Sequence, residues 1–162
     1  MSFTLLFLCT GNSCRSQMAE GYARLLGERI FGSTLRVESA GLEPKGLHPR
    51  AIQVMAEEGI DISSQTSDLL QPGHIARTDM IVTLCGDAEE RCPVTPPSVE
   101  RRHWPLPDPA RATGSEEQVL RTFRFVRDEI RTRVAALLQE LQMRQDFLSS
   151  DPTPEESGVL GA

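Results

Sequence analysis

A cysteine and an arginine six positions apart, Cys9 and Arg15, enclose a short polar loop near the start of the chain. The loop contains Gly11 and Asn12, follows the apolar run 5–8, and precedes a stretch with helical periodicity. In such a loop, backbone N–H groups and the positive end of the helix converge on one point, which favours an anion. The guanidinium of Arg15 can also donate two hydrogen bonds to a tetrahedral oxyanion. We therefore predict an oxyanion site made of Thr10, Gly11, Asn12, Ser13, Cys14, Arg15 and Ser16.

The field that binds an oxyanion also stabilises a thiolate. A free thiol has a pKa of about 8.5, and a helix N-terminus with a nearby cation lowers such values to roughly 3.5–7.5. We therefore predict that Cys9 is a nucleophile at neutral pH. The alternative is a buried apolar cysteine that ends a strand, the usual environment of a lone cysteine. We favour the nucleophile because Cys, Gly, Asn, Arg and Ser share one loop.

A second pair of cysteines, Cys85 and Cys92, follows another apolar run, 80–84. The carboxyl ends of parallel strands meet at one sheet edge, so Cys85 should face Cys9. The residues between the pair, GDAEER, favour a short helix, which would separate the two α-carbons by about 10.5 Å. A disulfide needs roughly 4.4–6.8 Å. A Cys85–Cys92 disulfide would therefore require residues 85–93 to unwind; the alternative is two independent thiols on one helical face.

Asp108 lies in a proline-rich loop after the fourth apolar segment. A carboxylic acid opposite a nucleophile can protonate an oxygen that leaves the central atom. An Asp-Pro pair is also common in turns without catalytic function. Both interpretations of Asp108 stay open on the sequence alone.

The elements that must position these residues alternate between strands and helices. We predict strands at 5–8, 35–40, 80–84 and 101–104, and helices at 17–30, from Pro49 to Gly59, at 86–91, and from a cap at Ser115 to Leu141. The polar segment 60–75 is expected to be irregular, with Ser67 capping one short turn. This alternation indicates an α/β fold, a three-layer α/β/α sandwich around a four-stranded parallel sheet.

Composition limits the alternatives. At 162 residues and 39% hydrophobic content, the chain can form one substantial core, which we assign to residues 1–145. Residues 146–162 are rich in Pro, Ser, Glu and Gly and are expected to form a flexible tail. A net charge of −6 argues against a nucleic-acid or anionic-membrane surface. The absence of a signal-like or 18-residue apolar stretch predicts a cytoplasmic protein.

A structural zinc site is the main rival for the four cysteines at positions 9, 14, 85 and 92. Zinc ligand pairs are usually separated by two to four residues. Here four residues separate the first pair and six separate the second. A metal on the first pair would also consume the predicted nucleophile, so the pattern favours thiol chemistry over zinc binding.

Several motifs together resemble the thioredoxin-coupled arsenate reductases, which are built on the low-molecular-weight protein tyrosine phosphatase fold. The resemblance covers residues 3 to about 143. It is carried by CTGNSCRSQMAEG at 9–21, SAG at 39–41, TSDL at 66–69, VTLCGDAEERCP at 82–93 and HWPLPDPA at 103–110. Cys-x5-Arg alone is typical of the phosphatase superfamily, and the second cysteine pair points to the reductases.

The resemblance implies a relay of three cysteines. Cys9 attacks arsenate, Arg15 and the loop amides hold its oxygens, and Asp108 protonates the departing hydroxyl. Cys85 then attacks the sulfur of Cys9 and arsenite leaves. Cys92 next attacks Cys85, and thioredoxin reduces the resulting Cys85–Cys92 disulfide. The expected partners are arsenate and thioredoxin, no bound cofactor is required, and the fold is normally monomeric.

The resemblance also assigns supporting roles within and beside the loop. Ser16 is expected to hydrogen-bond the Cys9 thiolate, and Cys14 to be structural or a side partner of the nucleophile. By motif, a monovalent cation such as potassium would bind at Asn12, Glu20, Ser39 and Asp68. The alternative for these four residues is capping and loop hydrogen bonding.

Two other functions remain open. A low-molecular-weight protein tyrosine phosphatase would use only Cys9, Arg15 and Asp108, although Ala110 and Arg111 stand where such phosphatases usually have aromatic residues. A non-catalytic thiol redox sensor would exchange with thioredoxin without reducing arsenate.

Overall fold

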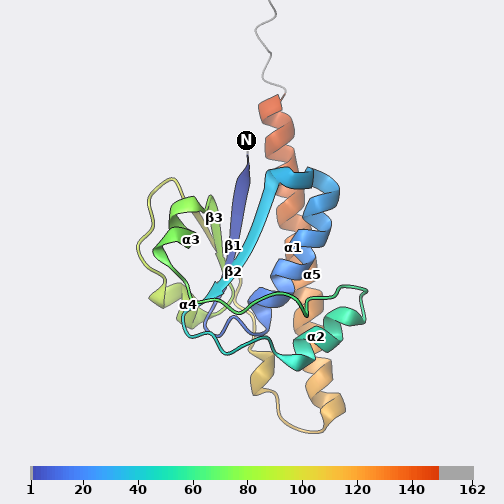
Figure 1. The fold of residues 1–162 in the computed structure, drawn as a ribbon. Helices are drawn as coiled ribbons and strands as arrows, with labels where there is room; N and C mark the ends of the chain where they lie inside the picture. The colour runs from blue at the N-terminus through green and yellow to red at the C-terminus, as the bar shows by residue number, and fades with distance from the viewer. Residues whose placement is uncertain (1, 150–162) are drawn as a thin grey trace, which may run out of the picture.

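The computed structural model describes residues 2–149, which form a four-stranded parallel sheet flanked by helices (Figure 1). The strand order is β2-β1-β3-β4. The strands are β1 (Phe3–Cys9), β2 (Leu35–Gly41), β3 (Met80–Thr83) and β4 (Glu100–His103). All three pairings are parallel, so the carboxyl ends of the strands share one edge of the sheet. The four predicted strands are confirmed, with ends that differ by at most two residues from the prediction.

The central strand β1 explains the layered architecture. Its residues from Leu5 to Leu8 are fully buried, which means that both faces of the strand are covered. A continuous apolar run is typical of a parallel strand with helices on each side. In the register, Cys9 at the end of β1 lies opposite Gly41 at the end of β2.

Helices cover the sheet on both sides, which confirms the predicted three-layer α/β/α sandwich. Helices α1 (Arg15–Phe31), α2 (Pro49–Ala56) and α5 (Glu116–Ser149) pack together on one side. The shorter helices α3 (Pro72–Arg77) and α4 (Gly86–Arg91) lie on the other side of the sheet in Figure 1. Two 3-10 turns, η1 (Gly32–Thr34) and η2 (Pro109–Arg111), complete the fold.

Helix α5 begins as the sequence predicts. The Ser115 hydroxyl accepts a hydrogen bond from the Gln118 N–H at 3.2 Å, and the Gln118 side chain accepts from the Ser115 N–H at 2.8 Å. This reciprocal pair is a capping box. The helix continues to Ser149, beyond residue 145, where the sequence predicts that the domain ends. The rest of the predicted tail, 150–162, lies outside the described residues.

The prediction of an irregular segment at 60–75 was wrong in its last residues, because helix α3 begins at Pro72. Proline suits a first helical turn, and the side chains of Gln71 and His74 form a capping box around it. Ser67 does not cap a turn. Its hydroxyl accepts from the Gly46 N–H at 3.2 Å and donates to the Gly11 carbonyl at 3.3 Å, and it therefore ties two loops together.

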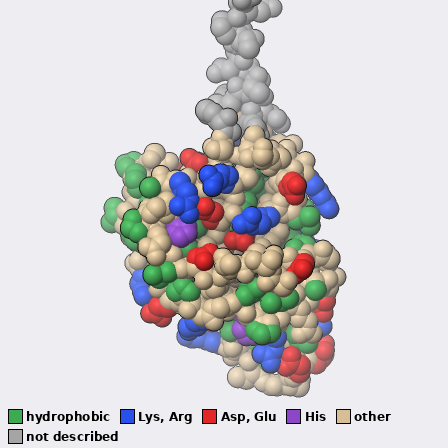
Figure 2. Space-filling view, in the orientation of Figure 1, with side chains coloured by type: hydrophobic (Ala, Val, Ile, Leu, Met, Phe, Trp, Pro, Cys, Tyr) green, Lys and Arg blue, Asp and Glu red, His purple; other side chains and the backbone are tan. Residues whose placement is uncertain are grey.

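Charged side chains of both signs are interspersed on the face shown in Figure 2. Many form ion pairs between elements, such as Arg131 of α5 with Glu58 after α2 at 2.7 Å. Within the described range, none of the helices combines the length and the apolar character needed to cross a bilayer.

Candidate active site

The loop between β1 and α1, residues 10–14, is called the anion loop here because its backbone is arranged to bind an anion. Its carbonyls are tied outward: Thr10 O accepts from Glu43 N, Gly11 O from Lys45 N, and Ser13 O from His48 N, at 2.8–3.1 Å. The side-chain amide of Gln17 donates to the Asn12 carbonyl at 2.9 Å. In a trans peptide unit the C=O and the following N–H point in opposite directions. The N–H groups of residues 11–14 therefore face the centre of the loop.

Asn12 gives the loop its shape and directs a chain of hydrogen bonds to Cys9. It is the sole non-glycine residue with positive φ (44°) in the described part of the chain, a conformation found in anion-binding backbone nests. Its Nδ2 donates to Ser16 Oγ at 2.8 Å and to Ser39 Oγ at 3.0 Å. Because Ser16 Oγ accepts from Asn12, the Ser16 hydroxyl can donate its proton to Cys9 Sγ, which lies 2.9 Å away.

Arg15 is held beneath the pocket by main-chain oxygens. Its guanidinium donates to the carbonyl of Leu106 at 2.9 Å and to that of Leu84 at 3.5 Å. One Nη lies 3.9 Å from the carboxylate of Asp108. The Asp108 carboxylate also accepts from the Ala110 N–H at 3.0 Å, which caps the turn η2. Both interpretations of Asp108 therefore have support: it caps a turn, and it lies beside the arginine of the anion site.

Cys85 lies at the same edge as Cys9, as the topology predicts. Cys85 Sγ is 3.3 Å from Thr10 Oγ1, and Thr10 directly follows Cys9. The same sulfur accepts a hydrogen bond from the Ala88 N–H at 3.3 Å, so Cys85 is the N-cap of α4. The predicted helix between the two cysteines is confirmed: α4 spans Gly86–Arg91, with Cys85 and Cys92 at its two ends.

All four cysteines are free thiols. Cys92 is half-buried at the C-terminal end of α4, and this burial raises its thiol pKa. Cys14 is almost completely buried, and desolvation raises its pKa to about 12. A thiol with so high a pKa is a poor nucleophile at neutral pH. Cys14 is therefore best described as a packing residue of the loop.

Cys9, Cys85, Arg15 and Asp108 line one pocket of about 760 Å³ at the carboxyl edge of the sheet. The pocket is also lined by three residues that were not among the predicted catalytic or oxyanion-binding residues: Lys45, His48 and Arg111. Lys45 is the only lysine of the chain, and this rarity was the one feature of the sequence that could have drawn attention to it. Burial lowers the pKa of His48, which keeps its imidazole neutral.

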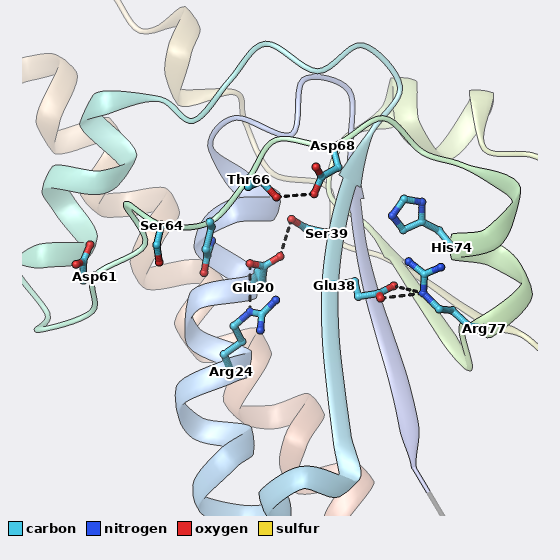
Figure 3. A pocket seen from close by; sticks show the side chains of 11 residues that line it. Glu20, Arg24, Glu38, Ser39, Asp61, Ser64, Thr66, Asp68, His74 and Arg77 are labelled. Carbon is cyan, nitrogen blue, oxygen red and sulfur yellow. Dashed lines mark hydrogen bonds and ion pairs between the residues drawn. The ribbon is translucent and has the colours of Figure 1, made fainter.

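Three of the four residues predicted to hold a cation lie around a second pocket of about 460 Å³ (Figure 3). Glu20, Ser39 and Asp68 line this pocket. Ser39 donates to Glu20 at 2.9 Å, and burial raises the pKa of the Glu20 carboxyl. Asn12 accepts from the Asp68 N–H at 2.8 Å and connects this cluster to the anion loop. Among the described residues, no group of three or more His, Cys, Asp or Glu side chains is arranged to hold a metal ion.

Comparison with known proteins places this site in a family. The model of the low molecular weight phosphotyrosine protein phosphatases matches residues 4–146. An arsenate reductase of Bacillus licheniformis is 53% identical over 131 residues, 81% of this chain and 91% of that protein. A solved arsenate reductase in its phosphate binding state is 39% identical, with a TM-score of 0.68 over 85% of this chain and 98% of that one.

A solved thioredoxin-dependent arsenate reductase of Corynebacterium glutamicum is 26% identical. It superimposes with a TM-score of 0.69 over 88% of this chain and 63% of that one. The expected fold and family are confirmed. The chain belongs to the low molecular weight phosphotyrosine protein phosphatase family and groups with its arsenate reductases.

Proposed function

We propose that this protein reduces arsenate to arsenite through a relay of three thiols. One observation carries the proposal: Cys9 and Cys85 line the same anion pocket, while Cys92 ends the helix that Cys85 begins. The similarity to arsenate reductases over four fifths of the chain supports the same activity.

In the first step, the Cys9 thiolate attacks arsenic and displaces a hydroxyl, which leaves as water with the proton of Asp108. The inward N–H groups of the loop and the guanidinium of Arg15 hold the remaining oxygens. In the second step, the Cys85 thiolate attacks the Cys9 sulfur. A sulfur–sulfur bond forms, the sulfur–arsenic bond breaks with its electron pair on arsenic, and arsenite leaves. The two thiols thus supply the two electrons of the reduction.

In the third step, the Cys92 thiolate attacks the Cys85 sulfur and Cys9 leaves as a thiolate. This step requires α4 to unwind, because a folded helix keeps its two ends too far apart for a disulfide. An external dithiol then reduces the Cys85–Cys92 disulfide. We propose thioredoxin for this role, by analogy with the thioredoxin-dependent relative.

A coupled assay tests the relay. Oxidation of NADPH is followed with arsenate, thioredoxin and thioredoxin reductase. We expect turnover to vanish in Cys9→Ser, Cys85→Ser and Cys92→Ser, whereas the matched variant Cys14→Ser keeps most of it. Turnover that persists in Cys85→Ser would refute the relay, and NADPH oxidation that does not need arsenate would favour a redox sensor.

Phosphatase activity is a second candidate, which the family match favours. Cys9, Arg15 and Asp108 suffice for phosphate ester hydrolysis, and the pocket bears Ala110 and Arg111 at its rim in place of aromatic residues. We propose that this activity is a side reaction. Hydrolysis of an aryl phosphate should survive Cys85→Ser and be lost in Cys9→Ser.

We further propose that a monovalent cation such as potassium binds in the second pocket. The buried carboxylate of Glu20, with Asp68 and the Ser39 hydroxyl, presents the oxygen donors that such an ion prefers. Arg24 Nε already pairs with Glu20 Oε2 at 3.2 Å and offsets part of the desolvation that raises the Glu20 pKa, and a cation would offset more of it. Through Asn12 it would also steady the anion loop. Potassium chloride should raise the melting temperature more than choline chloride does, and Glu20→Gln should remove the difference.

We propose a monomer that acts in the cytoplasm, where thiols are kept reduced. Light scattering at enzyme concentrations used for turnover tests the first point, and cell fractionation tests the second.

A further inference from the structure

Four polar residues form a closed ring that joins α4 to the anion loop. Thr10 Oγ1 donates to Asp87 Oδ2 at 2.8 Å, and Arg91 donates to the same oxygen at 2.9 Å. The other Nη of Arg91 donates to Glu43 Oε1 at 3.3 Å. The Glu43 N–H donates to the Thr10 carbonyl at 2.8 Å, which closes the ring. The ring thus links the anion loop, α4 and the loop between β2 and α2.

Helix α4 has little else to hold it. It contains six residues, fewer than an isolated helix needs to be stable, and Ala88 is its only buried member. On its other side, Glu89 accepts from the Thr83 hydroxyl at 2.6 Å and lies 3.6 Å from Arg101. The folded state of α4 therefore depends strongly on side-chain contacts at its surface.

The relay itself removes one of these contacts. Cys85 Sγ caps α4 by accepting from the Ala88 N–H. When Cys85 bonds to Cys9, its sulfur turns toward the anion loop and the cap is lost, which weakens the helix. At that stage the new disulfide fixes only the N-cap of α4, and the contacts of the ring are the noncovalent ones that hold the rest of the helix to the anion loop.

We propose that Asp87, Arg91 and Glu43 are positioning residues that keep α4 folded against the anion loop, and that their contacts set the rate at which Cys92 reaches Cys85. The inference rests on the proposed relay. In the step concerned, the Cys85–Cys92 bond forms, the Cys9–Cys85 bond breaks, Cys9 takes the electron pair, and the Cys92 thiol has first lost its proton to water. No further oxidant or reductant takes part.

The ring is exposed, and exposed ion pairs shift an equilibrium about two- to fivefold. Arg91→Gln should therefore speed the second exchange about two- to fivefold. Arg91→Lys, which keeps the charge, should restore most of the wild-type rate. Gly86→Ala should act in the opposite direction. An added methyl there meets no atom within 4 Å, and the loss of glycine freedom favours the folded helix, so the exchange should slow about two- to fivefold.

The test is a single turnover of the reduced full-length protein with arsenate. Samples are quenched in acid, free thiols are alkylated, and mass spectrometry quantifies the Cys9–Cys85 and Cys85–Cys92 disulfides. Arsenite release reports the first exchange in the same samples. The matched control is Arg131→Gln, which breaks an exposed ion pair between α5 and Glu58 on a different surface. This control should leave both exchanges unchanged.

The outcomes separate the two proposals. If the wild type forms no Cys85–Cys92 disulfide, the relay itself fails. If it forms that disulfide but Arg91→Gln leaves the second exchange unchanged or slower, the positioning role is refuted. An equal slowing of both exchanges would show only structural damage and would also refute it. An unchanged rate in Gly86→Ala would mean that unwinding of α4 does not limit the exchange, and the proposal would fall.

Discussion

Gly41 offers a sensitive test of how closely the sheet packs against the anion loop. A methyl group on its α-carbon would lie 2.8 Å from the Thr10 carbonyl oxygen, 2.8 Å from Asn12 Cβ and 2.9 Å from Asn12 N. Ordinary carbon contacts lie at about 3.5–4.0 Å, so one side must move by about 0.7 Å. Gly41 cannot easily retreat. Its N–H donates to the Asp68 carbonyl and its carbonyl accepts from the Leu70 N–H, both at 2.8 Å. The loop must therefore move.

The size of the effect follows from this geometry. Inserting a methyl group into a packed site costs about 1–3 kcal/mol. For a protein of this size each kcal/mol lowers the melting temperature by about 2–4 °C, so Gly41→Ala should melt about 2–12 °C below wild type. Asn12 would also lose its alignment with Ser16, to which it donates at 2.8 Å. Misplacement of catalytic groups by about 1 Å costs about 100-fold, so we expect kcat/KM for arsenate to fall about 10- to 100-fold.

The measurement combines thermal unfolding with the coupled arsenate assay. Gly73→Ala in α3 is the matched control, because its methyl would meet only the end of the flexible Arg77 side chain, at 3.4 Å. That variant should keep wild-type turnover. If Gly41→Ala retains both the melting temperature and the turnover of the wild type, the close approach of β2 to the anion loop does not constrain the site, and the reasoning is refuted.

Three further predictions follow from single contacts. Ser16→Ala removes the hydroxyl that lies 2.9 Å from Cys9 Sγ, and a hydrogen bond to a charged group is worth about 1.5–3 kcal/mol. Stopped-flow kinetics should therefore show that attack on arsenate is slowed about 10- to 100-fold, and a rate within threefold of wild type would contradict this role of Ser16. The hydrogen bond from Arg124 holds the pKa of Glu57 below 4.5, so its stabilisation is present above pH 4.5 and is lost as pH falls through the folded-state pKa. Urea unfolding should therefore show the free energy of unfolding falling below pH 4.5, less steeply in Glu57→Gln, and equal slopes would exclude this ion pair as a cause. Lys45→Gln should raise the KM for arsenate without changing kcat, and the difference should shrink at high salt, whereas a salt-independent effect would argue against electrostatic capture.

The elements around the site could be predicted because their signals are local. The apolar run 5–8, the loop with Gly11 and Asn12, and the periodic helix that follows all lie within 30 residues of one another. The helix between Cys85 and Cys92 could be predicted for the same reason. Helix α3 was missed because it has only six residues and none of them is buried, so it leaves no apolar periodicity in the sequence.

Contacts between distant segments could not be predicted from spacing. Lys45 donates its backbone N–H to the Gly11 carbonyl of the anion loop, and any residue except proline could make this bond, so the residue type does not predict it. The Thr10–Asp87 hydrogen bond joins residues 77 positions apart. Asp87 lies in the first turn of α4, where a carboxylate is favourable, but its contact with the anion loop depends on how β1 and β3 bring their ends together.

The two sides of the pocket are held by different kinds of contact, and this difference suits the proposed relay, which needs α4 to move while the anion loop stays. The anion loop is fixed mainly through its main chain, with the carbonyls of Thr10, Gly11 and Ser13 bound by backbone N–H groups. None of these bonds uses the sulfur of Cys9, so its reaction does not consume them. Helix α4 is fixed by side chains, and one of them, Cys85, is itself consumed in the proposed relay. The proposed chemistry therefore loosens α4 while the anion loop keeps its shape, so Cys92 can reach Cys85 and release the Cys9 thiolate into a loop that is still arranged for the next arsenate.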